Sequence, residues 1–317
     1  MIDLQNPEFQ LMRQGWVDAL IELGEQNPNV VVFDADLSKS TLTAQFKEKF
    51  PKRFFNMGIS EQDMVNEAAG MSLKGKIPFI TSYCVFLAGR AWDQIRNTAC
   101  YSNLNVKFGG AHAGISVGPD GATHQSLEDI AIMRVLPNMT VIAPSDYWET
   151  KKAILAAADI EGPVFVRFGR EKVPVVTSED LPFEVGKANL VEDGNDVTII
   201  ACGPLLYQSM LAVEELKKEG ISARLLNMHT IKPLDTEAIL QAAKDCGAFV
   251  TAEEHSVHGG LGSAVAEFLV QNLSVPMEMV ATQDTFGESG KPGELMEAYH
   301  IVAKDIVEKS KKAVGRK

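Results

Sequence analysis

Three short segments of the sequence hold polar residues whose types and spacing suit catalysis. The first is residues 58–63, GISEQD, which lead into an apolar stretch of helical period at residues 63–73. Ser60 followed by Asp63 predicts a helix N-cap and places Glu61 in the first helical turn. The helix dipole favours a carboxylate there, so a structural role alone would explain it. Because the helix that follows is strongly apolar, we expect Glu61 to be partly buried, as an acid–base group in a desolvated site would be.

The second segment is the glycine-rich stretch at residues 114–125, GISVGPDGATHQ. It contains Asp120 and His124, and His112 lies just before it. Loops at the carboxyl ends of parallel strands bind ligands in α/β folds, which makes this stretch a candidate substrate site. A solvated loop with incidental histidines would have the same composition, and the residues alone leave both interpretations open.

The third segment is residues 167–170, RFGR, at the end of a predicted strand. The guanidinium groups of Arg167 and Arg170 suit a phosphate or a carboxylate, which each could hold by paired hydrogen bonds. A surface salt bridge of little energetic value is the alternative.

Two further features carry no predicted chemistry. Residues 253–262, EEHSVHGGLG, lack the H-E-x-x-H spacing of zinc enzymes and the Lys-Ser/Thr of a Walker loop, so we predict a strand-to-helix turn and no metal ligands. The four cysteines are widely spaced and form no C-x-x-C pair, which is typical of reduced, mostly buried thiols.

The elements that must position these segments alternate along the chain. Apolar runs at residues 30–33, 79–83, 140–143 and 164–167 predict buried strands, and stretches of helical period at 9–24, 63–73 and 148–158 lie between them. This alternation predicts a parallel α/β sheet. Prolines and glycines interrupt the pattern at residues 171–195, and a second α/β pattern follows from residue 197, in which Asp235 is expected to cap a helix. We therefore predict an α/β protein of two domains, residues 1–172 and 195–317, joined by a linker at residues 173–194.

Composition excludes several classes of function. The chain has 317 residues and a net charge of −12, which argues against binding nucleic acid or an anionic membrane. No apolar run approaches the roughly 20 residues that span a bilayer. The first residues lack the basic and apolar regions of a signal peptide, so we expect a cytoplasmic protein.

The motifs resemble those of a known family. Residues 58–62, 83–94 and 120–125 are similar, in that order, to the pyrimidine-binding domain of transketolases and deoxyxylulose-phosphate synthases. Residues 230–235, 253–255, 259–262 and 284–290 resemble the C-terminal domain of the same enzymes. The likeness covers nearly the whole chain. It implies a parallel-sheet thiamine-diphosphate pyrimidine-binding fold followed by a transketolase C-terminal-like α/β domain.

One motif of the family is absent from the sequence. The diphosphate of thiamine diphosphate and its Mg²⁺ are held in this family by a separate domain with a Gly-Asp-Gly motif, which does not occur here. The resemblance therefore implies the C-terminal subunit of a split transketolase. Its expected partner is an N-terminal subunit that carries the diphosphate and Mg²⁺ site, and the expected assembly is α2β2.

The resemblance also implies roles for single residues. Glu61 matches the glutamate that hydrogen-bonds the aminopyrimidine and promotes its imino tautomer, and Phe86 and Tyr83 match aromatic residues that pack on the ring. Asp120 matches an aspartate that reads a sugar hydroxyl, and His124 matches a histidine near the reacting carbonyl oxygen.

The sugar-phosphate positions of the family correspond to His112, Arg13 and Arg170. A serine that contacts the phosphate in the family corresponds to Asp34, whose carboxylate would repel a phosphate. Arg90 and Asp93 follow the synthase form of the motif at 83–94 and are expected to contact substrate or another subunit.

The implied reaction is transfer of a two-carbon ketol unit from a ketose phosphate to an aldose acceptor. A β-like subunit of a 2-oxoacid dehydrogenase E1 is one alternative, although its loop is not expected to read Asp-Gly-x-Thr-His-Gln. A non-catalytic regulatory subunit with the same fold is another, and the presence of Glu61, His112, Asp120 and His124 argues against it. A deoxyxylulose-phosphate synthase normally carries all three domains in one chain.

Overall fold

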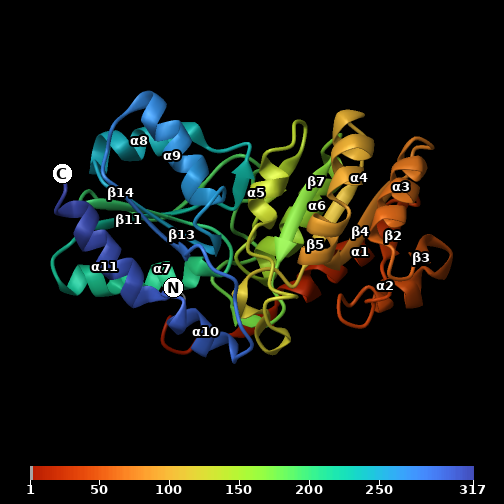
Figure 1. The fold of residues 1–317 in the computed structure, drawn as a ribbon, viewed down its shortest axis with the longest axis horizontal. Helices are drawn as coiled ribbons and strands as arrows, with labels where there is room; N and C mark the ends of the chain where they lie inside the picture. The colour runs from red at the N-terminus through yellow and green to blue at the C-terminus, as the bar shows by residue number, and fades with distance from the viewer. Residues whose placement is uncertain (1–2) are drawn as a thin grey trace.

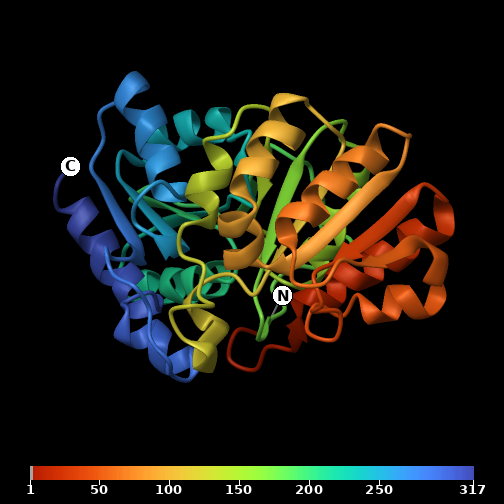
Figure 2. The same ribbon diagram turned by 45° about the vertical axis from the view of Figure 1, so that its right-hand side comes forward.

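The computed structural model of the protein describes residues 3–317. Two α/β units lie side by side, and Figures 1 and 2 show each sheet lying between helices. The first sheet has seven strands in the order β12-β6-β7-β5-β4-β2-β3, the second has five in the order β14-β13-β10-β11-β9, and β1 pairs with β8. No helix within residues 3–317 is both long enough and apolar enough to span a membrane.

The first unit is a parallel sheet whose strands are largely buried, as the apolar runs predicted. Its strands are β2 (Val30–Asp34), β3 (Phe54–Asn56), β4 (Ile77–Tyr83), β5 (Lys107–Ala111), β6 (Thr140–Ile142) and β7 (Val164–Phe168), all paired in parallel. Its helices are α1 (Met12–Gln26), α2 (Ala44–Lys49), α3 (Glu61–Ser72), α4 (Trp92–Gln94), α5 (Asp129–Arg134) and α6 (Tyr147–Asp159). The ends of β4 and β5, and the start of α3, hold the predicted catalytic segments.

The second unit repeats the α/β pattern. Its strands are β9 (Asn189–Glu192), β10 (Val197–Ala201), β11 (Ala223–Asn227), β13 (Phe249–Ser256) and β14 (Met277–Thr282), of which only β9 runs antiparallel to its neighbour. Its helices are α7 (Leu205–Lys218), α8 (Thr236–Cys246), α9 (Leu261–Asn272), α10 (Pro292–Ala298) and α11 (Ala303–Val314). The predicted α/β class is confirmed in both units.

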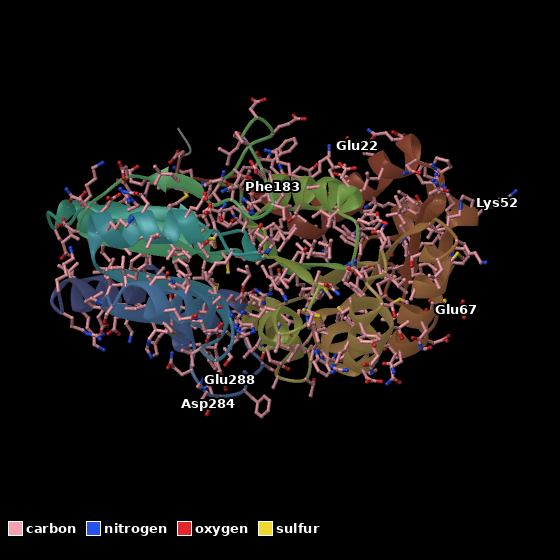
Figure 3. All side chains as sticks on the ribbon, turned by 90° about the horizontal axis from the view of Figure 1, so that it is seen from above. Glu22, Lys52, Glu67, Phe183, Asp284 and Glu288 are labelled. Carbon is pink, nitrogen blue, oxygen red and sulfur yellow. The ribbon has the colours of Figure 1, made fainter. Side chains whose placement is uncertain are left out.

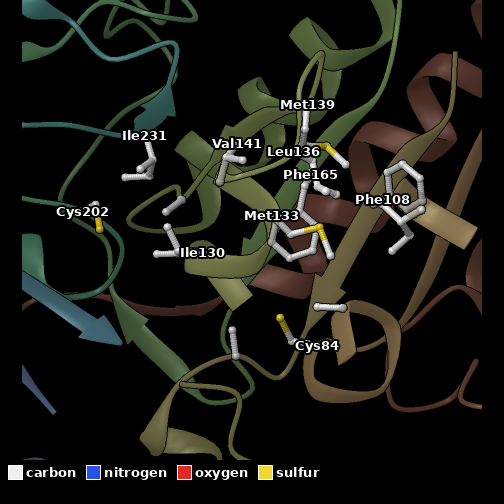
Figure 4. Close-up of a cluster of buried hydrophobic side chains, with 14 of the residues drawn as sticks. Cys84, Phe108, Ile130, Met133, Leu136, Met139, Val141, Phe165, Cys202 and Ile231 are labelled. Carbon is white, nitrogen blue, oxygen red and sulfur yellow. The ribbon is translucent and has the colours of Figure 1, made fainter. Parts of the chain in front are cut away.

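The two units share a sheet and a hydrophobic core. Strand β12 (Thr230–Lys232) follows β11 in the chain but pairs antiparallel with β6 of the first unit. One cluster of buried side chains runs from α5 of the first unit to β12 of the second, and Figure 4 shows Ile130 near Cys202 and Ile231. All four cysteines are buried and free, as the sequence predicted.

Some local predictions are confirmed and others are wrong. Asp235 accepts a hydrogen bond from the Ala238 amide at 3.1 Å and caps α8 as predicted. Ser60 is the N-cap residue of α3 and Glu61 lies in its first turn, as predicted, although the Ser60 side chain makes no capping hydrogen bond. Residues 9–11 form β1 (Phe9–Leu11) instead of the start of α1, because they pair with β8 (Lys172–Pro174).

Among the strands that the sequence did not predict, β5 and β9 have compositions that are not strand-like. Strand β5 reads KFGGA, and a Cβ at Gly109 would lie 2.4 Å from the Trp16 ring, so only glycine lets that ring pack on the sheet. Strand β9 lies inside the predicted linker at residues 173–194. Its side chains alternate between exposed and partly buried, and its partner β11 is distant in sequence, so no local apolar run marks it as a strand.

The Arg167 side chain lies in the interior and holds a carboxylate, so the predicted surface salt bridge is wrong and the carboxylate interpretation is confirmed for this residue. Its Nε donates to the Asp129 carboxylate at 2.7 Å, and its Nη2 donates to the Glu254 carbonyl at 3.1 Å. Only 4% of the arginine side chain and none of the aspartate side chain is exposed. Arg167 is therefore not a surface ion pair: it holds the Asp129 carboxylate by two hydrogen bonds and forms a buried link between α5, β7 and β13.

We predict that Arg167→Ala lowers the free energy of unfolding by about 3–5 kcal/mol, because the change leaves the Asp129 carboxylate buried without its cation. The control Lys218→Ala, which removes an exposed pair with Glu215, is expected to leave stability nearly unchanged. Urea unfolding measures the free energy of unfolding of each variant. Equal midpoints for them would contradict a structural role for the Arg167–Asp129 pair.

Candidate active site

Glu61 is the first residue of α3, and only 1% of it is exposed. Its Oε1 accepts a hydrogen bond from Ser82 Oγ of β4 at 2.9 Å, and its Oε2 pairs with Arg90 Nη1 at 2.6 Å. A buried carboxylate is tolerated only when it is paired and hydrogen-bonded, and both oxygens meet that requirement here. The predicted burial of Glu61 is confirmed.

Arg90 lies at the end of a π-helical segment, Val85–Arg90, an irregular turn that is common at functional sites. Its guanidinium carbon lies 4.5 Å from the centroid of the Phe86 ring, which adds a cation–π contact to the ion pair with Glu61. The sequence suggested a substrate or subunit contact for Arg90 and missed the pair with Glu61. Asp93 instead accepts from Asn97 Nδ2 at 2.5 Å in an exposed part of the next helical turn.

Four rings from separate segments meet beside Glu61. Tyr83, at the end of β4, stacks on His112 with the ring centroids 4.0 Å apart. The Phe86 centroid lies 5.8 Å from that of Tyr83 and 5.2 Å from that of His124. The structure therefore brings together residues that are as far apart in sequence as positions 61 and 124. Together they form a wall on which a flat heterocycle could pack.

His112 is held in an unusual state. It follows β5 directly, has a positive φ of 57°, and is 1% exposed. Burial, and then the positive charges of Arg13 and Arg170, lower the pKa of His112 to about 3. Its Nδ1 is buried and has no hydrogen-bond partner within residues 3–317. An orphaned ring nitrogen of a neutral histidine suits hydrogen bonding to a ligand better than it suits a closed core.

Two arginines, Arg13 and Arg170, lie close enough to His112 to lower its pKa. Arg170 pairs with Asp120 at 3.0 Å and also donates to the Val117 carbonyl at 3.0 Å. Arg13 donates to the Ser40 carbonyl at 2.8 Å, and burial followed by the charge of Arg170 lowers the pKa of its guanidinium. Two cations close enough to disfavour each other would be relieved by an anion, so this pair suits the phosphate of a sugar.

Asp34, which the sequence placed beside the phosphate, is fully buried at the end of β2. Its carboxylate accepts hydrogen bonds from the Leu37 amide at 2.5 Å, Thr41 Oγ1 at 2.8 Å and Thr43 Oγ1 at 2.9 Å. Burial raises the pKa of Asp34, the hydrogen bonds opposing the rise. The carboxylate therefore holds its own loop, and the expected conflict with a phosphate stays a prediction.

A pocket opens on the outer side of the Glu61 carboxylate. It is lined by Ile59, Ser60, Glu61, Gln62, Asp63, Asn66 and Arg90. The acidic residues at positions 253 and 254 contribute to no such pocket: Glu253 accepts from the Leu261 and Gly262 amides at the start of α9, at 2.7 and 2.8 Å. No group of three or more potential metal ligands occurs among the residues that the structure describes.

These residues fit the pyrimidine end of thiamine diphosphate. Glu61 would hold a ring nitrogen of the aminopyrimidine, and Phe86 with Tyr83 would pack on the ring. The orphaned His112 nitrogen, with the Tyr83 and His124 rings nearby, is available for a hydrogen bond to a ligand. The catalytic and binding roles of Glu61, His112 and His124, and of the aromatic and substrate residues, stay predictions.

Comparison with known proteins assigns the family. The chain matches the family described as transketolase, pyrimidine binding domain, over residues 10–176, and the one described as transketolase, C-terminal domain, over residues 186–306. It is 49% identical over 311 residues to the "Putative transketolase C-terminal section" of Methanocaldococcus jannaschii, covering 96% of this chain and 98% of that protein. It is 41% identical over 310 residues to the 6-deoxy-6-sulfo-D-fructose transketolase subunit SqwH of Clostridium sp., covering 98% and 96%.

A solved structure described as a split gene transketolase, inactive beta4 tetramer, has the same fold. Its TM-score is 0.91 at 49% sequence identity, and the match covers 97% of this chain and 99% of that one. Fold, site and comparisons together define a thiamine-dependent class of α/β protein with pyrimidine-binding and C-terminal domains. The chain belongs to the transketolase family, and it is similar to the separate C-terminal subunits found among its split members.

We predict that His112 makes folding less favourable as the pH falls. The pKa of His112 is 6.5 in the unfolded chain and about 3 in the folded one. Between these pH values the imidazole is protonated in the unfolded chain and neutral in the folded chain. The contribution of His112 to stability is therefore complete above pH about 6.5 and is lost towards pH about 3. Urea unfolding of His112→Asn and of the unchanged chain, at about pH 7 and about pH 5, measures the difference. An identical pH slope for both would show that His112 is not held neutral.

Proposed function

We propose that this chain is the C-terminal subunit of a split transketolase. It would transfer a two-carbon ketol unit from a ketose phosphate to an aldose acceptor, using thiamine diphosphate. The observation that carries the proposal is the buried Glu61 carboxylate, which opens onto a pocket and lies beside the wall formed by Tyr83, Phe86, His112 and His124.

Thiamine diphosphate, when bound, supplies the carbanion and the electron sink that this carbon–carbon chemistry needs. The chain itself would hold the pyrimidine ring in one orientation through Glu61 and Phe86. Ser82 and Arg90 fix both oxygens of Glu61, so the carboxylate is held in place before the cofactor binds. Because the Glu61 carboxylate is buried away from water, a hydrogen bond between it and a nitrogen of the pyrimidine ring would be stronger than an exposed one.

The substrate would lie between the rings and the arginine pair. His124, whose Nδ1 is 2.9 Å from Thr123 Oγ1, would stabilise charge on the reacting carbonyl oxygen. Neutral His112 would donate or accept a hydrogen bond without repelling Arg13 and Arg170. Asp120 would read a sugar hydroxyl while the two arginines bind the phosphate.

The assembly follows from what the chain lacks. Its sequence has no Gly-Asp-Gly motif, and its relative in the beta4 tetramer is described as inactive. We therefore propose an N-terminal partner subunit that holds the diphosphate and Mg²⁺, an α2β2 complex, and a cytoplasmic location. The relative from Clostridium sp. is named for 6-deoxy-6-sulfo-D-fructose, which is also an anionic sugar, so the arginine pair would suit either type of donor.

We predict that Glu61→Gln in the reconstituted complex lowers kcat by about 10²–10⁴-fold, because an amide cannot drive the proton transfer that a carboxylate drives. The matched control is Glu67→Gln, two turns along the same helix, where the side chain is exposed and lies at the molecular surface (Figure 3). A coupled assay of ketol transfer measures both. Unchanged turnover in Glu61→Gln would rule out the catalytic assignment.

We also predict that the chain alone, supplied with thiamine diphosphate and Mg²⁺, has no transferase activity and gains it only when an N-terminal subunit is added. The partner provides the diphosphate site, and without it the cofactor lacks its charged anchor. Isothermal titration of thiamine diphosphate into the chain with and without the partner checks this. Tight binding and turnover by the chain alone would contradict the split site.

A further inference from the structure

The loop of residues 113–126, here called the substrate loop, carries Asp120 and His124. Its two ends are joined by a bridge between Ala113 and Ser126, and the Gly114 amide donates to the Ser126 carbonyl at 2.9 Å. These contacts close the base of the loop. They do not fix the middle, where the functional side chains lie.

The second domain contacts the first part of the loop through Glu254 of β13. This side chain is only 2% exposed, and its Oε1 accepts a hydrogen bond from the Ser116 amide at 2.6 Å. A Cβ at Gly114 would lie 2.4 Å from the Glu254 carboxyl group, and Gly114 has a positive φ of 86°. The loop thus approaches Glu254 as closely as a glycine allows.

A second contact lies at the other end of the loop. Gln125, which is 3% exposed, donates from Nε2 to the Ile115 carbonyl at 3.0 Å and to the Glu288 carbonyl at 2.9 Å. Glu288 belongs to the segment at residues 284–290, which Figure 3 shows at the edge of the molecule with Asp284 beside it. A Cβ at Gly121 would lie 2.6 Å from Ser289 Oγ, so this segment also presses on the loop next to Asp120.

Glu254 is itself held in place. Arg167 donates to its carbonyl at 3.1 Å and to the Asp129 carboxylate at 2.7 Å, which ties β13 to the first domain. Glu253, the preceding residue, points instead to the start of α9. The two neighbouring glutamates of β13 therefore point in opposite directions: Glu253 towards the start of α9 and Glu254 towards the substrate loop.

We propose that Glu254 is a positioning residue for the transferase reaction. Its carboxylate, with the Gln125–Glu288 contact, holds the substrate loop so that Asp120 and His124 face the sugar. The C-terminal domain would thus act in substrate recognition without touching the substrate. This inference rests on the proposed function, but the loop contact can be tested without it.

The test uses hydrogen exchange of the full chain and kinetics of the reconstituted complex. Glu254→Ala is expected to speed amide exchange in residues 114–125 by about tenfold to hundredfold, the loss expected for a hydrogen bond to a charged group. In the complex it is expected to raise KM for the sugar donor and lower kcat/KM by a similar factor, while the affinity for thiamine diphosphate stays within about twofold. Glu254→Gln keeps a carbonyl oxygen for the Ser116 amide and is expected to restore most of the protection.

The matched control is Glu253→Gln, an equally buried glutamate on the same strand. It is expected to destabilise the start of α9 and to leave loop exchange and KM unchanged. If Glu254→Ala leaves loop exchange unchanged, or if Glu253→Gln speeds it equally, the positioning role is overturned. If loop exchange rises as expected but no ketol donor is turned over by the unchanged complex, the proposed function fails and the structural part of the inference stands. Should Glu254→Ala fail to fold, Gln125→Leu tests the same support through the contact with Glu288.

Discussion

A carboxylate that is almost wholly withdrawn from water is the constraint on which this site depends. Glu61 stays charged in the interior only if both of its oxygens are satisfied, and Ser82 and Arg90 satisfy them from two different elements. The end of strand β4 must therefore place Ser82 beside Glu61, and the π-helical segment that follows must bring Arg90 back to α3. The same turn places Phe86 under the guanidinium and against His124. A cofactor ring that joined this arrangement would find its hydrogen-bond partner already fixed.

The two domains are less independent than their family boundaries suggest. Strand β12 crosses to the first sheet, one core cluster spans both units, and Arg167 ties β7 to β13 through buried hydrogen bonds. The close glycine contacts at positions 114 and 121 lie where the second domain meets the loop that carries Asp120. The second domain thus packs directly against the loop that is proposed to bind the substrate.

Much of the fold and of the site could be predicted from the sequence. Buried parallel strands read as apolar runs, so β2, β4, β6, β7 and β10 were found, and the family motifs led to Glu61, Phe86 and His124. Strand β5 was missed because its glycines suit close packing under Trp16 and carry no strand signal. The hydrogen bonds of Asp34 were not predicted, because they come from hydroxyl groups of its own loop, at positions 41 and 43, which fold back onto it.

Long-range pairing explains the other misses. The partners of Arg90 and Arg167 lie 29 and 38 residues away, and no local pattern connects them. A signal did exist for Arg90, since a glutamate expected to be buried requires a cation, and Arg90 lies in the neighbouring motif. For Glu254 there was none, because its partner is a backbone amide 138 residues away.

The central claim is that Glu61 binds the pyrimidine end of a coenzyme whose diphosphate is held by another subunit. An experimental structure of the complex with its N-terminal partner, thiamine diphosphate and Mg²⁺ tests it most directly. We expect a ring nitrogen within hydrogen-bond distance of the Glu61 carboxylate, the ring against Phe86, and the diphosphate on the partner. A ring bound elsewhere, or a complex that retains no thiamine diphosphate, would contradict the account.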